Sequence, residues 1–381
     1  MTSLPRRHWL LGASALPAAL LLSGCDGIDL PFLGRSPEPG SCLGPSEELP
    51  EEVHRTIPDG MQVDPGPADP EVRFVSRSLA LSPDGSLLAA CETSTRHRMD
   101  LADAYGVILW DTATGEVLRR IEPPTSGLLA WHPEGQRLAI AASRYISIVD
   151  LEGNLEWNLI GHELPEDEIA NIRDIAFSPN GNQLASSGSD RTVRLWDLDG
   201  DACGAGHVLE PGHRSNSALS YSPDGSTLAV GSTSTSSESD PHNPPELWDP
   251  AAGERLQILE DLDGNVFDLE YDADGTLLVV TDEPTTLTLI RADGTREQGP
   301  VTDSARFAEL AIGPRQRIAV RGGYEELLIW DRETGEETRL EIEMDVSSMR
   351  WAPDESALYC LSGRDGVSAW DGQEWRAFDL P

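Results

Sequence analysis

Few side chains in this sequence are arranged for catalysis. The 381 residues include eight His and five Cys but no Lys, which excludes Schiff-base chemistry and the phosphate-binding loop of nucleotide hydrolases. No Gly-x-Ser-x-Gly, His-Glu-x-x-His or Cys-x-x-Cys motif occurs. His97, His207 and His242 fall in predicted loops, beside no nucleophile that the sequence can identify. The residue types therefore favour a protein that is not an enzyme and that uses no cofactor.

Two acidic segments have the alternating oxygen ligands of a calcium loop. They are residues 197–201 and 261–265, and each contains an Asp-Gly pair. No Glu follows at the spacing of an EF-hand, and Asp-Gly is common in turns between strands. We therefore expect no metal site, and a small-ligand or cation sensor remains an alternative.

The N-terminus has the layout of an export signal. Arg6 and Arg7 precede an apolar run over residues 9–22, which is too short to span a bilayer comfortably. The following Ser23-Gly24-Cys25 resembles the lipobox of prokaryotic lipoproteins, in which the Cys receives lipid and becomes the mature N-terminus. This resemblance implies a signal peptide over residues 1–24 and lipidation of Cys25. It also implies attachment to the cell membrane on the extracytoplasmic side of a prokaryotic cell.

Two features of this signal leave alternatives open. The Arg pair fits both the twin-arginine route and the general secretory route. An ordinary signal peptide with a nearby Cys is the alternative to the lipobox.

Residues 25–70 predict a linker between the lipid and a folded domain over residues 71–381. The linker is rich in Pro, Gly and Glu, a composition that cannot bury a core. Such a segment would hold the domain clear of the membrane. The alternative is that parts of it pack along the side of the domain.

The other four cysteines divide into two pairs. Cys91 and Cys360 fall on predicted strands, where a small buried residue fits. Cys42 lies in the linker and Cys203 in a predicted loop. A disulfide between the latter two is allowed outside the cell, but no spacing argues for it.

A turn of the type Ser178-Pro179-Asn180-Gly181 recurs seven times along the domain. The second residues of these turns are Pro83, Pro133, Pro179, Pro223, Ala273, Pro314 and Pro353. Their spacings of 50, 46, 44, 50, 41 and 39 positions are typical of four-stranded propeller blades. In the third copy, residues 172–177, 183–187 and 191–197 predict the first three strands. We predict an all-β, seven-bladed β-propeller of four-stranded antiparallel blades.

This repeat resembles the WD-repeat β-propeller family from about Val72 to the C-terminus. The third copy places four polar side chains where that family has a structural hydrogen-bonded tetrad: His162, Ser186, Asp190 and Trp196. The resemblance implies that these side chains satisfy one another and join three strands. The second and fifth copies replace the Trp with Val149 and Ile290, so a related seven-bladed family is the alternative.

The closure of the ring has two possible solutions. Residues 374–378 can form the outer strand of the last blade, and residues 71–75 remain available at the seam.

The net charge limits the partners. It is −38, from 66 acidic residues against 28 basic ones. Such a field repels nucleic acid and anionic lipid headgroups, so we expect no nucleic-acid partner and attachment to the membrane through the N-terminal lipid alone. We expect a monomer.

Departures from the regular repeat predict a binding face. Extra residues occur at 92–105, 163–168 and 232–246, and all three connections leave an up-and-down blade by the same end. The alternative is that insertions are simply tolerated where they are exposed. The candidate binding residues are Glu92, Arg96, His97, Arg98, Asp100, Asp103, Tyr105, Glu163, Glu166, Asp167, Glu168, Glu238, Asp240 and His242.

These observations favour a lipid-anchored scaffold that binds another protein or an envelope component. The enzymatic alternative is a propeller hydrolase or lyase with its site at the axial mouth. That alternative requires several His and acidic side chains to converge on the axis.

Overall fold

The structure of the protein is a computed structural model. It describes residues 40–44, 73–74, 78–93, 106–121, 127–142, 145–162, 171–199, 202–212, 216–232, 243–262, 265–281, 286–300, 309–322, 326–342, 344, 346–362 and 365–379. Within these ranges the regular structure consists of strands, without a helix. Consequently, no described segment is a helix long and apolar enough to cross a membrane.

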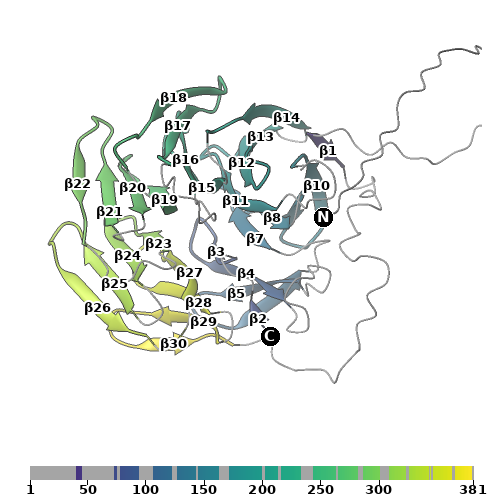
Figure 1. The fold of residues 1–381 in the computed structure, drawn as a ribbon. Coiled ribbons are helices and arrows are strands. Elements are labelled where there is room, and N and C mark those ends of the chain that lie inside the picture. Colours follow the sequence, from purple (N-terminus) through teal and green to yellow (C-terminus); the bar gives the residue numbers. More distant parts are fainter. Residues whose placement is uncertain are drawn as a thin grey trace, which may run out of the picture. The chain divides into compact units, whose positions relative to one another are not determined.

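The strands form seven antiparallel sheets around a common axis, as Figure 1 shows. Each sheet is one blade, and the chain runs outward through a blade before it enters the next. The predicted all-β, seven-bladed propeller is therefore confirmed.

The strands of the first four blades have the following bounds. Blade 1 contains β2 (Arg73–Phe74), β3 (Ala80–Leu81), β4 (Leu87–Thr93), β5 (Gly106–Asp111) and β6 (Val117–Ile121). Blade 2 contains β7 (Leu128–Trp131), β8 (Arg137–Ala142), β9 (Tyr145–Asp150) and β10 (Leu155–Ile160). Blade 3 contains β11 (Ile172–Phe177), β12 (Gln183–Gly188), β13 (Val193–Asp199) and β14 (Ala202–Leu209). Blade 4 contains β15 (Asn216–Tyr221), β16 (Leu228–Ser232), β17 (Glu246–Asp249) and β18 (Glu254–Ile258).

The remaining three blades complete the ring. Blade 5 contains β19 (Val266–Tyr271), β20 (Leu277–Thr281), β21 (Thr286–Ile290) and β22 (Arg296–Gln298). Blade 6 contains β23 (Leu310–Ile312), β24 (Arg317–Gly322), β25 (Glu326–Asp331) and β26 (Glu337–Glu341). Blade 7 contains β27 (Val346–Trp351), β28 (Leu358–Ser362), β29 (Gly366–Trp370) and β30 (Trp375–Ala377).

The recurring turn joins the first two strands of each blade. In blade 3, Ser178 Oγ accepts the Gln183 N–H at 3.0 Å, and Gly181 adopts a φ of +75°. Glycine takes this left-handed conformation without strain, whereas other residues rarely do. Gln316 and Glu355 replace the glycine in blades 6 and 7 and still have φ values of +73° and +57°. The turn geometry is thus kept even where its preferred residue is lost.

Seven apolar clusters fill the seven interfaces between adjacent blades. Between blades 3 and 4, for example, Leu195 packs with Leu219 and Val230. Burying one such side chain stabilises the fold by about 1.5–3 kcal/mol. Because each blade has apolar side chains on both faces, every blade depends on two neighbours.

The last interface closes the ring between blades 7 and 1. Leu88 and Ile108 of blade 1 share a cluster with Leu361 of blade 7. Beyond β30, the Asp379 carbonyl accepts the Trp110 indole N–H at 2.8 Å, and Arg376 donates to the Thr112 and Ala113 carbonyls at 2.8 Å each. The outer strand of blade 7 is thus β30, from the C-terminal segment, and the residues after it bind blade 1. This is the first of the two predicted ways to close the ring.

The other predicted contributor, residues 71–75, also enters the fold in part. Arg73 and Phe74 form β2, which pairs with Thr93 and Glu92 of β4. This pairing lies within blade 1, and among the described residues blade 7 takes no strand from the N-terminal segment.

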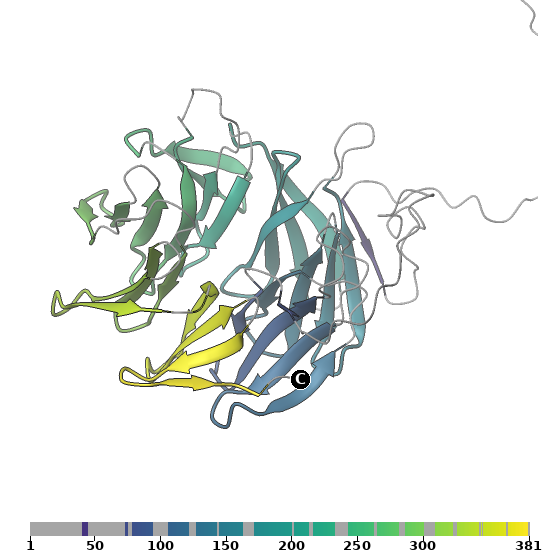
Figure 2. The ribbon, with the colours of Figure 1, turned by 60° about the horizontal axis from the view of Figure 1, so that its bottom comes forward.

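One strand of the predicted linker belongs to the propeller. β1 (Ser41–Leu43) pairs antiparallel with β10, as a fifth strand on the outer edge of blade 2. Figure 2 shows β1 in purple outside that blade. Residues 41–43 are therefore not linker, because the outer edge of β10 offers them unpaired backbone groups. The alternative of packing along the side of the domain holds for this stretch.

Candidate functional site

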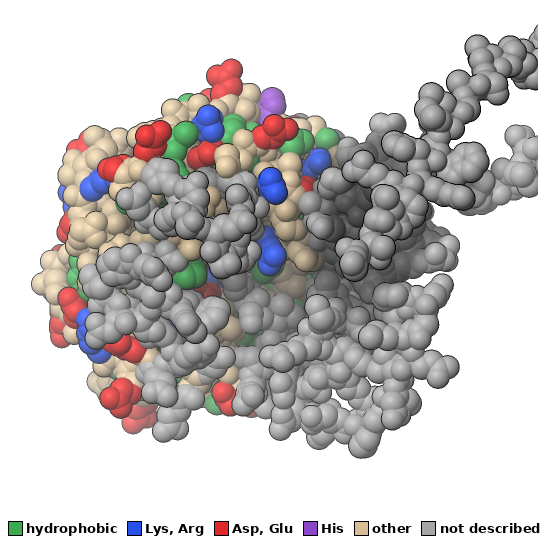
Figure 3. Space-filling model, in the orientation of Figure 1, with side chains coloured by type: hydrophobic (Ala, Val, Ile, Leu, Met, Phe, Trp, Pro, Cys, Tyr) green, Lys and Arg blue, Asp and Glu red, His purple; other side chains and the backbone are tan. Residues whose placement is uncertain are grey.

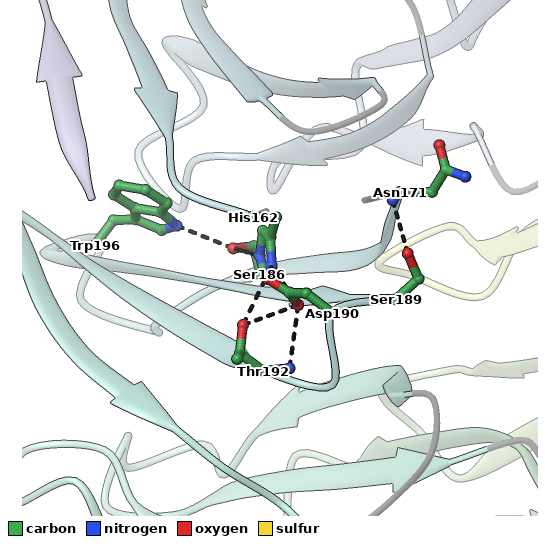
Figure 4. Close-up of polar contacts among 7 residues, drawn as sticks. All are labelled: His162, Asn171, Ser186, Ser189, Asp190, Thr192 and Trp196. Atoms are coloured by element: carbon green, nitrogen blue, oxygen red, sulfur yellow. Dashed lines mark hydrogen bonds and ion pairs between the residues drawn. The ribbon is translucent and has the colours of Figure 1, made fainter. Parts of the chain in front are cut away.

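A cluster of four polar side chains joins blade 3 to the chain that enters it (Figure 4). The Trp196 indole N–H on β13 donates to Ser186 Oγ on β12 at 3.0 Å. His162, which follows β10, places Nε2 2.8 Å from the same hydroxyl oxygen. Its Nδ1 lies 3.0 Å from both carboxylate oxygens of Asp190, in the turn after β12. The structure thus brings together His162, Ser186, Asp190 and Trp196, the four residues of the expected tetrad.

One arrangement of protons satisfies all of these atoms. The indole N–H donates to Ser186, the Ser186 O–H donates to His162 Nε2, and the Nδ1–H donates to Asp190. The same order of Ser, His and Asp activates the nucleophile in many hydrolases. Here Ser186 is 0% exposed and His162 1% exposed, so no substrate can reach the hydroxyl. The arrangement can therefore stabilise the fold but cannot act as a nucleophile.

Thr192 adds two donors to this cluster. Its backbone N–H and its hydroxyl donate to Asp190 Oδ1 at 3.1 and 2.9 Å. Burial alone would raise the pKa of Asp190, but the hydrogen bonds from His162 and Thr192 outweigh it and hold that pKa below its ordinary value. Sequence reasoning missed Thr192, although a hydroxyl two residues after a turn Asp is a common local partner.

The other six blades have no hydroxyl at the position of Ser186. Ser186 lies two residues after Leu184, which pairs with Trp196. By the same register, the other blades carry Ala90, Ile140, Val230, Val279, Val320 and Cys360. Among the described residues, none accepts the indole N–H of Trp248 in blade 4. The polar cluster of blade 3 is therefore an exception in a ring held mainly by apolar contacts.

A cavity of about 330 Å³ lies at the axis, among the inner strands of blades 2 to 7. Two of its carboxylates connect neighbouring blades. Asp174 accepts the Leu219 N–H at 2.8 Å, and Asp268 accepts the Leu310 N–H at 3.0 Å. Each is the third residue of the first strand of its blade. This shared position in the repeat could have been found from the sequence.

The same cavity contains an acidic and a basic side chain from two different blades. Glu270 and Arg350 line it, at a position where the third and fourth repeats have Ala176 and Ser220. Burial raises the pKa of Glu270 to about 8, and the negative charge of Asp268 adds to this effect while Arg350 opposes it. The hydrolase alternative requires both His and acidic side chains at the axis. The described lining contains acidic groups but no His.

The described residues contain no group of three or more His, Cys, Asp or Glu that could hold a metal ion. In the two acidic segments, Asp197 accepts a hydrogen bond from Gln183 at 3.0 Å, and Asp261 forms an ion pair with Arg296. These carboxylates thus have partners within the protein. On the face shown in Figure 3, acidic and arginine side chains are interspersed rather than separated into patches.

Most of the predicted binding residues lie outside the part of the chain that the structure describes. Glu92 is within β4, where its backbone pairs with Phe74 and Gly106. Cys25 is outside the described ranges, as are the other thirteen candidates: Arg96, His97, Arg98, Asp100, Asp103, Tyr105, Glu163, Glu166, Asp167, Glu168, Glu238, Asp240 and His242. Because neighbouring strands in each blade are antiparallel, the connections β4–β5, β10–β11 and β16–β17 begin and end at one face.

A disulfide connects β1 to blade 3. Cys42 on β1 is bonded to Cys203 on β14, 161 positions later in the chain. Both residues pack against the apolar cluster between blades 2 and 3. Cys91 and Cys360 are buried and free, as expected of small residues on core strands.

Comparison with known proteins supports the WD-repeat resemblance. The family model described as "WD domain, G-beta repeat" matches residues 153–197, from the end of blade 2 to the Trp-Asp pair of blade 3. The Protein LST8 homolog of Drosophila melanogaster is 24% identical over 177 residues, which are 46% of this chain and 53% of that protein. The COMPASS component SWD3 of Saccharomyces cerevisiae is 26% identical over 122 residues, which are 31% of this chain and 33% of that protein. The chain spans about half the length, or less, of these curated relatives.

A solved structure supports the fold alone. The β-propeller domain of Myceliophteria thermophila Cps50 (Swd1) superposes with a TM-score of 0.62 at 16% identity, covering 79% of this chain and 100% of that domain. The chain is thus similar to WD-repeat propellers in both repeat sequence and architecture.

Proposed function

We propose that this seven-bladed, WD-repeat-like propeller is an extracytoplasmic, lipid-anchored scaffold that binds another protein or an envelope component. The observation that carries the proposal is the ring itself, which presents the connections β4–β5, β10–β11 and β16–β17 at one face. Long connections on a rigid scaffold are where recognition usually resides. We call this surface the long-loop face.

The relatives support a binding role. One of them is named as a component of an assembly, COMPASS. In the described part of this chain, the Ser-His-Asp arrangement is buried and the axial cavity has acids without His. These features favour interaction over hydrolysis.

The cysteines support the location. Disulfides persist in oxidising compartments and are rare in the cytosol of most organisms. The bond between Cys42 and Cys203 therefore fits export, and the lipobox ending at Cys25 supplies the anchor. Replacing Cys25 with Ser should release the protein from the membrane fraction into the medium. Retention of that variant in the membrane would contradict the anchor.

The binding face has a separate test. Cross-linking on intact cells, followed by mass spectrometry, identifies the proteins captured by the native chain. Neutralising the four acids Glu163, Glu166, Asp167 and Glu168 to Gln or Asn should abolish that capture, as should shortening residues 94–105 to a tight turn.

The matched control neutralises exposed acids at the opposite end of the blades, Glu116, Glu333 and Glu336, and should leave capture unchanged. Equal thermal stability of both variants would show that folding is intact. Undiminished capture after both changes to the long-loop face would disprove its role.

A further inference from the structure

The strand β1 and its disulfide divide the segment that precedes the propeller into two parts. Residues 40–44 are fixed on the rim of blade 2, and Arg73 is fixed in blade 1. Residues 45–72 therefore connect two fixed points of the same domain. Only the chain before Gly40 extends from the propeller toward the N-terminus.

The fit of residues 40–43 to the rim is specific. Three residue pairs join β1 to β10, from Ser41 with Ile160 to Leu43 with Asn158. The Gly40 N–H donates to the Ile160 carbonyl at 2.8 Å. Gly40 has a φ of +88°, and a Cβ there would lie 3.2 Å from Ala205 of blade 3. A larger residue would therefore be strained both by its backbone and by its neighbour.

The disulfide strengthens a pairing that is short. A contact of three residues on the edge of a sheet is marginal when it stands alone. The covalent bond from Cys42 to Cys203 adds a link to the outer strand of the next blade. We use the name rim clasp for residues 40–43 together with this disulfide.

We propose that the rim clasp is the mechanical attachment point of the propeller to the membrane. The proposal rests on the lipid anchor at Cys25 proposed above. Gly40 lies 15 positions after Cys25, and Arg73 lies 48 positions after it. At about 3.3 Å per extended residue, the closed clasp limits the reach to about 50 Å, against about 160 Å if the chain were free up to β2. The clasp thus keeps the rim of blades 2 and 3 within about 50 Å of the lipid.

Site-specific proteolysis of the full-length, membrane-bound protein tests this attachment. A protease recognition site is inserted after Gly66, between β1 and β2, and membranes are sedimented after cleavage. With the clasp closed, the cut propeller should stay in the membrane pellet. Addition of dithiothreitol, which reduces the disulfide to two thiols, should release it. Release without the reductant would overturn the proposal.

Two further variants separate the clasp from the lipid anchor. With Cys42 and Cys203 both replaced by Ser, cleavage after Gly66 should release the propeller without reductant; retention would show that the disulfide is not what holds it. A second protease site placed after Arg35 should release the propeller with or without reductant. Failure of that release would overturn the lipid anchor, whereas a non-reducing gel of the protein cut after Gly66 would still report whether the fragments are joined.

Discussion

Blades 3 and 4 are consecutive copies of one repeat, yet different forces hold them. In blade 3, Trp196 donates to Ser186, which is linked through His162 to Asp190. In blade 4, Val230 takes the place of Ser186, and among the described residues no group accepts the Trp248 indole N–H. Blade 3 also carries the disulfide to β1, whereas blade 4 has no covalent link in the described structure.

The difference shows that the repeat specifies a shape rather than a set of interactions. Blade 4 has apolar burial and two local contacts in place of the polar cluster. Glu246 accepts the Gly212 N–H at 2.9 Å, and the Arg255 guanidinium lies 5.8 Å from the centre of the Trp248 ring. Both blades keep the same strand register at the Trp position. A fully satisfied polar network and an apolar core can thus support the same sheet.

The largest expected effect comes from the disulfide that distinguishes blade 3. Replacing Cys42 and Cys203 with Ser should lower the free energy of unfolding by about 2–5 kcal/mol, because the bond restricts the unfolded chain over a long loop. Thermal unfolding of the soluble domain measures the loss. Dithiothreitol should reproduce it in the parent protein and have no effect on the variant. An unchanged melting temperature in the reduced parent protein would show that the disulfide does not stabilise blade 3.

The next effect concerns the polar cluster. Ser186→Ala should destabilise the protein by about 2–3 kcal/mol, because it leaves Trp196 Nε1 and His162 Nε2 buried without a hydrogen-bond partner. Ser187→Ala is the matched control, since Ser187 is also 0% exposed but its hydroxyl has no hydrogen-bond partner among the described residues. The control should be neutral within about 0.5 kcal/mol. Equal losses in denaturant unfolding would show that the network adds nothing beyond packing.

A smaller and pH-dependent effect extends the comparison to blade 5, where Glu270 replaces the small residues of blades 3 and 4. Its pKa is raised to about 8, so the folded state keeps a proton that the unfolded chain releases above its ordinary pKa of about 4.5. The contribution of Glu270 to stability is therefore complete at low pH and decreases as the pH rises toward 8. Glu270→Gln should remove this decrease and stabilise the protein by about 1–3 kcal/mol at pH 8.

The control for this titration is Glu341→Gln, at an exposed position on the outer strand of blade 6. Its pH profile of unfolding should follow that of the parent protein. A Glu270→Gln profile parallel to the parent over pH 4–8 would show that Glu270 is not held in its protonated form.

The smallest effect tests whether blade 4 can regain a polar contact. Val230→Thr places a hydroxyl where Ser186 stands in blade 3, so the Trp248 N–H gains an acceptor and the change should be neutral within about 1 kcal/mol. Val279→Thr is the control, because Val279 has the same position in blade 5, where Ile290 stands in place of the Trp and offers no indole N–H, and it should cost about 1–3 kcal/mol. If both variants lose the same stability, Trp248 does not need a partner.

The sequence predicted those parts of the fold that repeat. The strand predicted over residues 172–177 is β11, and the strand predicted over 183–187 is β12 without its last residue. The third strand was predicted over 191–197 but begins two residues later, because Arg191 adopts a φ of +68° in the turn. Turn residues and strand alternation are local, so seven copies of them reinforce each other.

The sequence did not predict the features that depend on distant segments. The 161 positions between Cys42 and Cys203 carry no local signal, and their bond follows only once blades 2 and 3 are adjacent. β1 has three residues, which are too few for a periodic pattern to indicate a strand. The sequence could not predict that Glu270 and Arg350 line one cavity, because they lie on inner strands two blades apart.

The closure of the ring has a consequence for the order in which the protein is made. A ribosome produces blade 1 first, and the apolar side of that blade, including Leu88 and Ile108, finds its partners only in residues 352–378. The Trp110 indole N–H donates to the Asp379 carbonyl, which is made after all the strands of the ring. Blade 1 therefore keeps an uncovered apolar side through most of translation. The complete ring can close only after residues up to Asp379 have been synthesised.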